Sequence, residues 1–218
     1  MAEDFKTFMS FTEPEMAQEI VAILTEGKIL HNIHDSRKDF DPGMGNNESG
    51  KSIDIQVRPQ DFPKAVNLIN EKLELDESQI DPEHFLFGFT NDELIDVIKH
   101  ADEWHPLDVK LAKHILNKNG VVLSQDDLET LQKKRIEEKA KPEKNAAEWI
   151  VIGYIFALGG GFLGFFIGYH LAHFKKTLPD GSQVYSYHES DRRNGNRILL
   201  LSAISLLGWI AFYIWKAK

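Results

Sequence analysis

The chain has 218 residues, no cysteine and a formal net charge of −9. The absence of cysteine excludes disulfides, thiolate catalysis and cysteine-ligated zinc. The charge is unevenly distributed, because residues 1–132 hold 27 acidic and 12 basic side chains, whereas residues 133–218 hold 7 acidic and 13 basic ones. The acidic part argues against a nucleic-acid partner, which requires clustered cations, and the basic part suits anionic lipid headgroups.

The N-terminal residues alternate strand and helix signals. Residues 5–11 (FKTFMSF) are short and aromatic, and they predict a strand. Thr12 and Glu15 match a capping box ahead of an amphipathic helix that ends at Gly27. Residues 28–34 (KILHNIH) then predict a second strand.

The pattern continues with a strand, a helix and a further strand. Residues 53–57 alternate apolar and polar side chains, and Pro63 opens a second helix. The alternating phenylalanines of residues 84–89 (HFLFGF) predict a closing strand. This order predicts an α+β fold in which residues 1–90 form a ferredoxin-like split βαβ domain.

Three stretches of this domain resemble the small prokaryotic signal-transducing domains that share the plan of PII-type nitrogen regulators. The stretches are FKTFMSF, EPEMAQEIVAILTEGKI and SIDIQVRPQDFPKAVNLI, within residues 5–73. The resemblance implies that the loop between the second and third strands, Asp35–Lys51, contacts ligands or protein partners. Its candidate contact residues are Arg37, Lys38, Asp39, Asp41, Gly43, Gly45, Asn46, Asn47, Gly50 and Lys51.

The same loop matches the phosphate-loop pattern GxxxxGK[ST] at residues 45–52 (GNNESGKS). A phosphate site needs a strand before the loop and a helix after it, whereas here a polar segment precedes and a strand follows. We therefore expect no nucleotide site, and an enzymatic function would depend on this pattern alone. His31 and His34 are three positions apart on a strand and face opposite sides, so they predict no metal site.

Residues 91–148 predict a short helical region and a basic linker. Thr90 and Glu93 match a capping box, Pro106 opens another helix, and Ser124 caps a third, highly charged one. Trp104 lies between these helices. It either closes a small helical core or anchors a protein partner.

Two uncharged runs later in the chain predict membrane-spanning helices. Residues Trp149 to Tyr169 number 21 and residues Ile198 to Trp215 number 18. At about 1.5 Å per residue, both approach the thickness of a hydrocarbon core, about 30 Å. We therefore expect transmembrane helices over residues 149–171 and 198–215, joined by a polar loop over residues 172–197.

Small residues recur along the first run, which predicts close packing against the second helix. The candidates for this packing are Gly153, Ala157, Gly160, Gly161, Gly164 and Gly168. Three successive glycines, residues 159–161, leave open a kink or a re-entrant turn in place of a straight span.

The polar loop contains a Pro-Asp-Gly turn at residues 179–181, which predicts a short hairpin. His170, His173 and His188 have a spacing that metal sites also use, but structural zinc takes four converging ligands. We therefore expect these side chains to anchor at the membrane interface, with no metal and no cofactor.

The charges beside the spans predict the sidedness of the chain. No basic segment followed by an apolar one is found at the N-terminus, which argues against a signal peptide. Basic residues outside the two spans number eight, against five in the polar loop. The eight are Lys133, Lys134, Arg135, Lys139, Lys141, Lys144, Lys216 and Lys218, and the five are Lys175, Lys176, Arg192, Arg193 and Arg197. This excess predicts a multi-pass protein of a bacterial inner membrane with both termini in the cytoplasm.

Together these features predict a membrane-anchored regulatory or signal-transducing protein whose cytoplasmic domain binds a small ligand or a protein partner. We expect it to act by binding and not by catalysis, and to associate in the lipid bilayer with a protein partner or with further copies of itself. The alternative is a non-catalytic accessory subunit of a membrane protein complex, in which the hairpin packs against other subunits.

Overall fold

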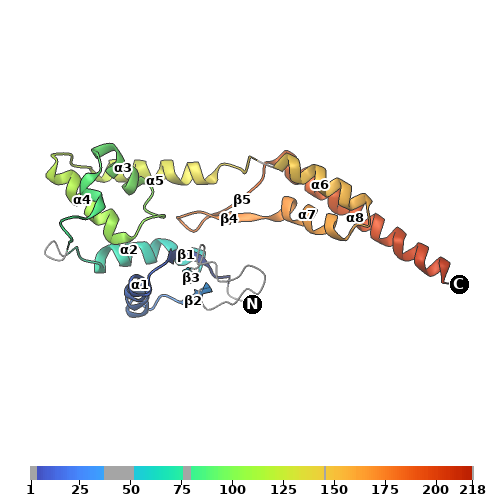
Figure 1. Ribbon diagram of the computed structural model, residues 1–218, viewed down its shortest axis with the longest axis horizontal. Coiled ribbons are helices and arrows are strands. Elements are labelled where there is room, and N and C mark those ends of the chain that lie inside the picture. Colours follow the sequence, from blue (N-terminus) through green and yellow to red (C-terminus); the bar gives the residue numbers. More distant parts are fainter. Residues whose placement is uncertain (1–3, 37–51, 76–79, 145, 218) are drawn as a thin grey trace. The chain divides into compact units, whose positions relative to one another are not determined.

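The computed structural model describes residues 4–36, 52–75, 80–144 and 146–217 (Figure 1). Internal contacts divide the chain into two units, one of Met1–Lys139 with Thr177–Ser182 and one of Ala140–Lys176 with Gln183–Lys218. The fold is mixed α+β, as predicted, because a small antiparallel sheet with helices comes first and the remainder is mostly helical.

Three strands form the sheet of the first unit. They are β1 (Lys6–Phe11), β2 (His31–Asp35) and β3 (Ile53–Val57). β3 lies in the middle and pairs antiparallel with both neighbours, so Ile55 is opposite Met9 on β1 and Ile33 on β2. Side chains of β3 alternate between buried and half-buried positions, which confirms the period of two that predicted this strand.

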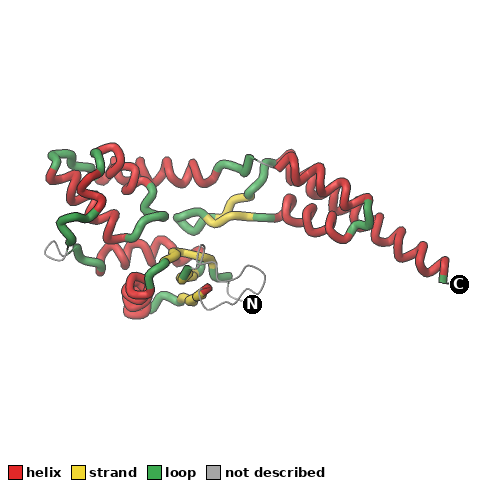
Figure 2. The backbone as a smooth tube through the Cα atoms, viewed as in Figure 1, coloured by secondary structure: helices red, strands yellow, loops and turns green. Residues whose placement is uncertain are grey.

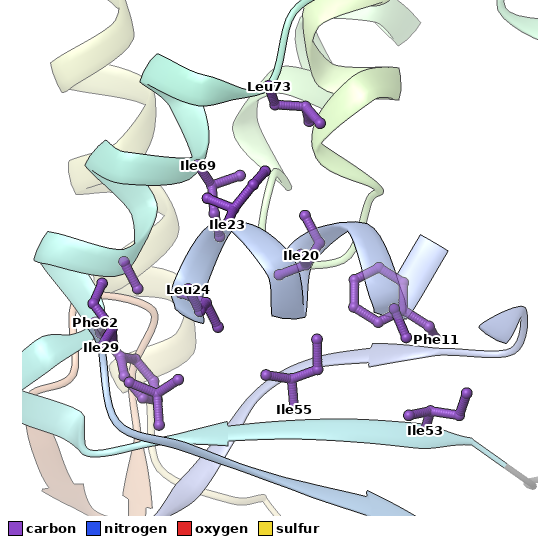
Figure 3. Packing of buried hydrophobic residues seen from close by; sticks show 13 residues of the cluster. Phe11, Ile20, Ile23, Leu24, Ile29, Ile53, Ile55, Phe62, Ile69 and Leu73 are labelled. Carbon is purple, nitrogen blue, oxygen red and sulfur yellow. The ribbon is translucent and has the colours of Figure 1, made fainter. Parts of the chain in front are cut away.

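Helices α1 (Pro14–Glu26) and α2 (Phe62–Lys72) pack against this sheet and close the first core. Figure 3 shows apolar side chains of both helices gathered above the strands. The fully buried members of this core include Ile20, Leu24, Ile55, Ile69 and Leu73. Gly27, which follows α1, lies against Leu68 of α2, and a Cβ at this position would overlap the Leu68 side chain. Glycine therefore allows the two helices to approach closely.

The start of α1 differs from the prediction. The helix begins at Pro14, its N-cap residue is Glu13, and no side chain caps it. The predicted capping box of Thr12 with Glu15 is therefore wrong. Proline is favoured in the first turn of a helix because its φ angle is already helical and its missing N–H has no partner there.

The predicted closing strand at residues 84–89 is also wrong. Residues Phe85–Gly88 form a 3₁₀ helix, η4, and the sheet has three strands among the described residues. The backbone N–H of Leu86 donates to Nδ1 of His84, which starts the turn. Leu86 is fully buried while Phe85 and Phe87 are about half exposed, so the buried residue lies between the phenylalanines. The alternating phenylalanines are therefore not the inward face of a strand.

Three helices form the second core of this unit. They are α3 (Asn91–Lys99), α4 (Pro106–Lys118) and α5 (Gln125–Ala140). The predicted capping box of Thr90 with Glu93 is confirmed, and Ser124 makes the same reciprocal exchange with Asp127. Gly120 ends α4 with a φ of 82°, a backbone angle that glycine adopts without strain. The core residues of α3 and α4 include Leu94, Val97, Ile98, Leu111 and Leu116.

The remaining elements are α6 (Ala146–Leu158), α7 (Phe162–His173), the short strands β4 (Lys175–Thr177) and β5 (Gln183–Tyr185), and α8 (Glu189–Lys216). All of them belong to the second unit except Thr177, the last residue of β4. Figure 2 shows α6 and α7 as separate helices alongside α8. The predicted hairpin of residues 176–187 is confirmed by the pairing of β4 with β5. The predicted straight helix over residues 149–171 is wrong, because the chain turns back at residues 159–161.

Candidate functional site: a C-terminal apolar bundle

Three successive glycines form the turn between α6 and α7. Gly160 has a φ of 140° and Gly161 a φ of 82°, which L side chains rarely adopt. The N–H of Gly161 donates to the carbonyl oxygen of Phe156 at 3.0 Å, and this bond caps the last turn of α6. The sequence left open whether residues 159–161 form a turn, and in the structure they do.

The other small residues lie where the three helices touch. A Cβ on Gly164 would stand 2.6 Å from the backbone nitrogen of Ala157 on α6 and 2.6 Å from Oγ of Ser202 on α8. A Cβ on Gly168 would stand 2.9 Å from the carbonyl oxygen of Gly195 on α8. Gly153 lies against Ile198 and Ile167 in the same way. Glycine at these positions allows the helix backbones to approach more closely than larger residues would.

The contacts also define the direction of each helix. Along α7, Gly168 lies beside Gly195 and Gly161 lies beside Ser202, so α7 runs antiparallel to α8. The Tyr154 hydroxyl of α6 donates to Oδ1 of Asn194, which lies near the start of α8. α6 therefore runs from the beginning of α8 towards its middle, and α7 returns.

Hydrogen bonds hold the polar ends of this bundle together. The N–H of Glu143, just before α6, donates to the carbonyl oxygen of Ser186 at 2.8 Å, and the N–H of Ser186 donates to that of Phe174 at 3.0 Å. Nζ of Lys176 donates to the carbonyl oxygen of Lys141 at 2.6 Å. The chain therefore enters α6, leaves α7 and enters α8 at one end of the bundle.

α8 is long and apolar enough to cross a membrane, and it is the one such helix in the described part of the chain. By this measure α8 contains the predicted span over residues 198–215, whereas the predicted span over residues 149–171 is not found, because α6 and α7 have 13 and 12 residues. Beyond the α6–α7 turn, α8 carries exposed large apolar side chains. They are Leu207, Trp209, Ile210, Phe212, Tyr213, Ile214 and Trp215. A Cβ on Gly208 would contact nothing within 4 Å.

Aromatic and basic side chains gather at the polar end of the bundle. His170 stacks on Phe174 and meets the edge of the Tyr187 ring, and His173 stacks on Tyr169. The guanidinium of Arg192 lies 3.2 Å from the centre of the Tyr185 ring. Such groups are typical of the boundary between hydrocarbon and water. In the described residues no group of three His, Asp or Glu side chains is placed to hold a metal ion, so His170, His173 and His188 do not converge on one.

A second cluster lies in the first unit, at the start of α4. Nδ1 of His105 accepts a hydrogen bond from the N–H of Leu107 and so caps α4, and Nε2 of His84 lies 3.5 Å from Oδ1 of Asp108. Burial lowers the pKa of His105, against the opposing effects of Asp108, Glu19 and Glu13. Burial likewise raises the pKa of Asp108, against the opposing charges of His105 and His84.

Aromatic rings adjoin this cluster. Phe85 stacks on both His84 and Trp104, and Phe89 meets the edges of Phe85 and Trp104. Phe85 is about half exposed, whereas Trp104 is half-buried among the residues of the helical core. We call Phe85, Phe89 and Trp104, with His84, the aromatic cluster. The sequence reasoning missed it because residues 84–89 predicted a strand, although His105 before Pro106 was a visible sign of a helix cap.

The candidate binding loop, Arg37 to Lys51, lies outside the described residues, as does most of the GNNESGKS pattern. The residues on either side of it are described. The N–H of Ser36 donates to the carbonyl oxygen of Ser52 at 3.0 Å, and the N–H of Ser52 donates to Oγ of Ser36 at 2.8 Å. These bonds join the two ends of the loop.

Comparisons with known protein families, with curated protein sequences and with solved structures gave no match.

Proposed function

We propose that this protein is a membrane-anchored regulatory protein whose first unit binds a protein partner or a small ligand, with no chemistry of its own. The observation that carries the proposal is α8, a 28-residue helix of whose apolar length only 11% is buried within the chain. Burying one large apolar side chain contributes about 1.5–3 kcal/mol. Leaving the half-exposed side chains from Leu207 to Trp215 in water would therefore cost on the order of 10 kcal/mol, and hydrocarbon removes this cost.

The aromatic cluster supports binding by the first unit. Exposed aromatic side chains are enriched in protein interfaces because they bury a large area with little loss of conformational freedom. Phe85 offers such a surface, and the stacked His84 and Trp104 hold it in place. The resemblance of residues 5–73 to signal-transducing domains supports the same kind of role, and it adds the loop Asp35–Lys51 as a second candidate contact.

The alternative, an accessory subunit of a membrane complex, has one observation in its favour. Gly208 on the exposed part of α8 has open space beside it, which leaves room for a helix of another protein. In that case the partner would contact α8 and not the aromatic cluster.

Membrane anchoring is tested by fractionation of cells that produce the full chain. We expect the protein to stay in the membrane pellet after an alkaline wash. A variant with Leu207→Lys and Ile210→Lys should leave the pellet, because charges near the middle of a span are unfavourable by about 2.5–3.5 kcal/mol each. Release of the unaltered protein by the wash would refute membrane anchoring.

Binding is tested by affinity capture of the detergent-solubilised full chain, with identification of the proteins that accompany it. We expect Phe85→Ala to lose partners that the matched control Val122→Ala retains, because Val122 is exposed and lies outside the aromatic cluster. Partners that resist Phe85→Ala and are lost on Gly208→Leu would instead support the accessory-subunit function.

A further inference from the structure

We infer that α6 and α7 form a re-entrant hairpin that occupies one leaflet of the bilayer, and that α8 crosses the bilayer alone. This inference rests on the proposed membrane anchoring and adds how the anchor is inserted. The consequence is that the β4–β5 hairpin lies on the same side of the membrane as the first unit, and that the C-terminal end of α8 lies on the other side.

The lengths of the helices support a half-depth insertion. α6 has 13 residues and α7 has 12. At about 1.5 Å per residue they extend about 20 Å and 18 Å, against a hydrocarbon thickness of about 30 Å. Neither helix can cross the bilayer, whereas the uncharged run Ile198–Trp215 of α8 extends about 27 Å.

The position of the turn agrees with this depth. A Cβ on Gly161 would stand 2.9 Å from the side chain of Leu206. Leu206 is the ninth of the 18 residues in the uncharged run of α8. The turn therefore lies near the middle of the apolar length of α8, and the second half of that length has no hairpin beside it.

The backbone at the turn is compatible with this depth. Non-helical backbone is tolerated inside the hydrocarbon where it is buried in protein, and Gly161 is buried. An unsatisfied backbone group there costs several kcal/mol, so hydrogen bonds at the turn also matter. The N–H of Gly159 donates to Ile155, that of Gly161 donates to Phe156, and the carbonyl oxygen of Gly161 accepts from Phe165. Gly161 also packs against the backbone of α8.

The basic residues of the second unit provide an independent argument. In the re-entrant arrangement seven of them lie on the side of the first unit and two on the other side. The seven are Lys141, Lys144, Lys175, Lys176, Arg192, Arg193 and Arg197, and the two are Lys216 and Lys218. Two full spans would instead divide the same residues four against five. With Lys133, Lys134, Arg135 and Lys139 of the preceding linker added, the division is eleven against two in the re-entrant arrangement and eight against five with two spans. Basic residues collect on the cytoplasmic side, so the re-entrant arrangement has the larger charge asymmetry and the clearer orientation.

Sidedness of single cysteines tests the inference, because the chain has no cysteine of its own. Val122→Cys reports the first unit, Ser182→Cys the β4–β5 turn and Ala217→Cys the end of α8, and all three positions are exposed. Sealed right-side-out vesicles that carry each full-length variant are treated with a membrane-impermeant maleimide before and after permeabilisation.

We expect Val122→Cys and Ser182→Cys to be labelled only after permeabilisation, and Ala217→Cys to be labelled before it. Labelling of Ser182→Cys on the side opposite Val122→Cys, with Ala217→Cys on the same side as Val122→Cys, would overturn the re-entrant hairpin and leave membrane anchoring intact. If the protein were missing from the vesicles, the proposed anchoring would fail and the inference with it. Gln183→Cys repeats the measurement at the β4–β5 turn, and Gln132→Cys repeats the measurement on the first unit.

Discussion

Replacing Arg135 with methionine is expected to increase the local opening of α5. Nε and Nη2 of Arg135 donate to the two carboxylate oxygens of Asp102 at 2.7 and 2.9 Å, and the two side chains are only 10% and 20% exposed. In Arg135→Met, the ion pair that Asp102 keeps among the described residues is the weaker one with Lys139 at 3.6 Å. Breaking a buried ion pair costs about 3–5 kcal/mol, and the partial exposure of Asp102 places this pair near 3 kcal/mol. Glu103 is half exposed and adds little.

A loss of about 3 kcal/mol corresponds to roughly a 150-fold increase in local opening. Hydrogen exchange of the α5 amides in the detergent-solubilised full chain measures this opening. Lys134→Met is the matched control, because it removes an exposed charge from the same helix. In the double variant Arg135→Met with Asp102→Leu most of the protection should return, because removing both partners leaves no buried charge. Exchange within threefold of the unaltered protein in Arg135→Met, or no recovery in the double variant, would refute this reasoning.

Three further predictions concern the bundle, the α4 cap and η4. Gly161→Ala should destabilise the bundle by at least about 1–2 kcal/mol, because φ is positive there and the Cβ meets α8. Gly208→Ala should leave the stability of the bundle unchanged. Equal thermal aggregation of the Gly161→Ala and Gly208→Ala variants in detergent would contradict this difference. Burial lowers the pKa of His105, so its contribution to stability is complete above about pH 6.5 and is lost as the pH falls through the folded-state pKa. His105→Asn should keep the α4 cap but flatten the dependence of α4 hydrogen exchange on pH between 7.5 and 5, after correction for intrinsic rates; an unchanged slope would assign that dependence elsewhere. Leu86→Ala should lower the melting temperature more than Phe87→Ala, because burial at Leu86 implies a loss of about 2–5 kcal/mol, and the reverse order would restore the strand at residues 84–89.

Patterns that depend on neighbouring residues were predictable from the sequence. The period of two in Ile53–Val57, the capping box at Thr90 and the turn between β4 and β5 each depend on chemistry within a few residues, and the structure confirms them. The 18-residue apolar run predicted the long apolar helix found in the described part of the chain, for the same reason.

Features that depend on distant contacts were not predictable. Residues 84–89 have the alternation of a strand, but the burial of Leu86 against the helical core decides their conformation. The three glycines in the first apolar run are compatible with a straight helix and with a turn. The packing of α8 against Gly161, which is a distant contact, accompanies the turn in the structure. From the sequence, Arg135 and Lys139 were counted among the basic residues beside the spans, yet their partners are Asp102 and Glu103, more than 30 positions away.

In the re-entrant arrangement proposed above, the unequal lengths of the three apolar helices would give the anchor a tapered cross-section. Where α6 and α7 accompany α8, three helices of about 10 Å diameter would displace lipid, and beyond residue 206 only one would do so. An inserted hairpin of this kind enlarges the area of one leaflet relative to the other. Bilayers relieve such an imbalance by bending towards the narrower side, so this anchor would favour membrane that is already curved in that direction and would add to the curvature where many copies gather.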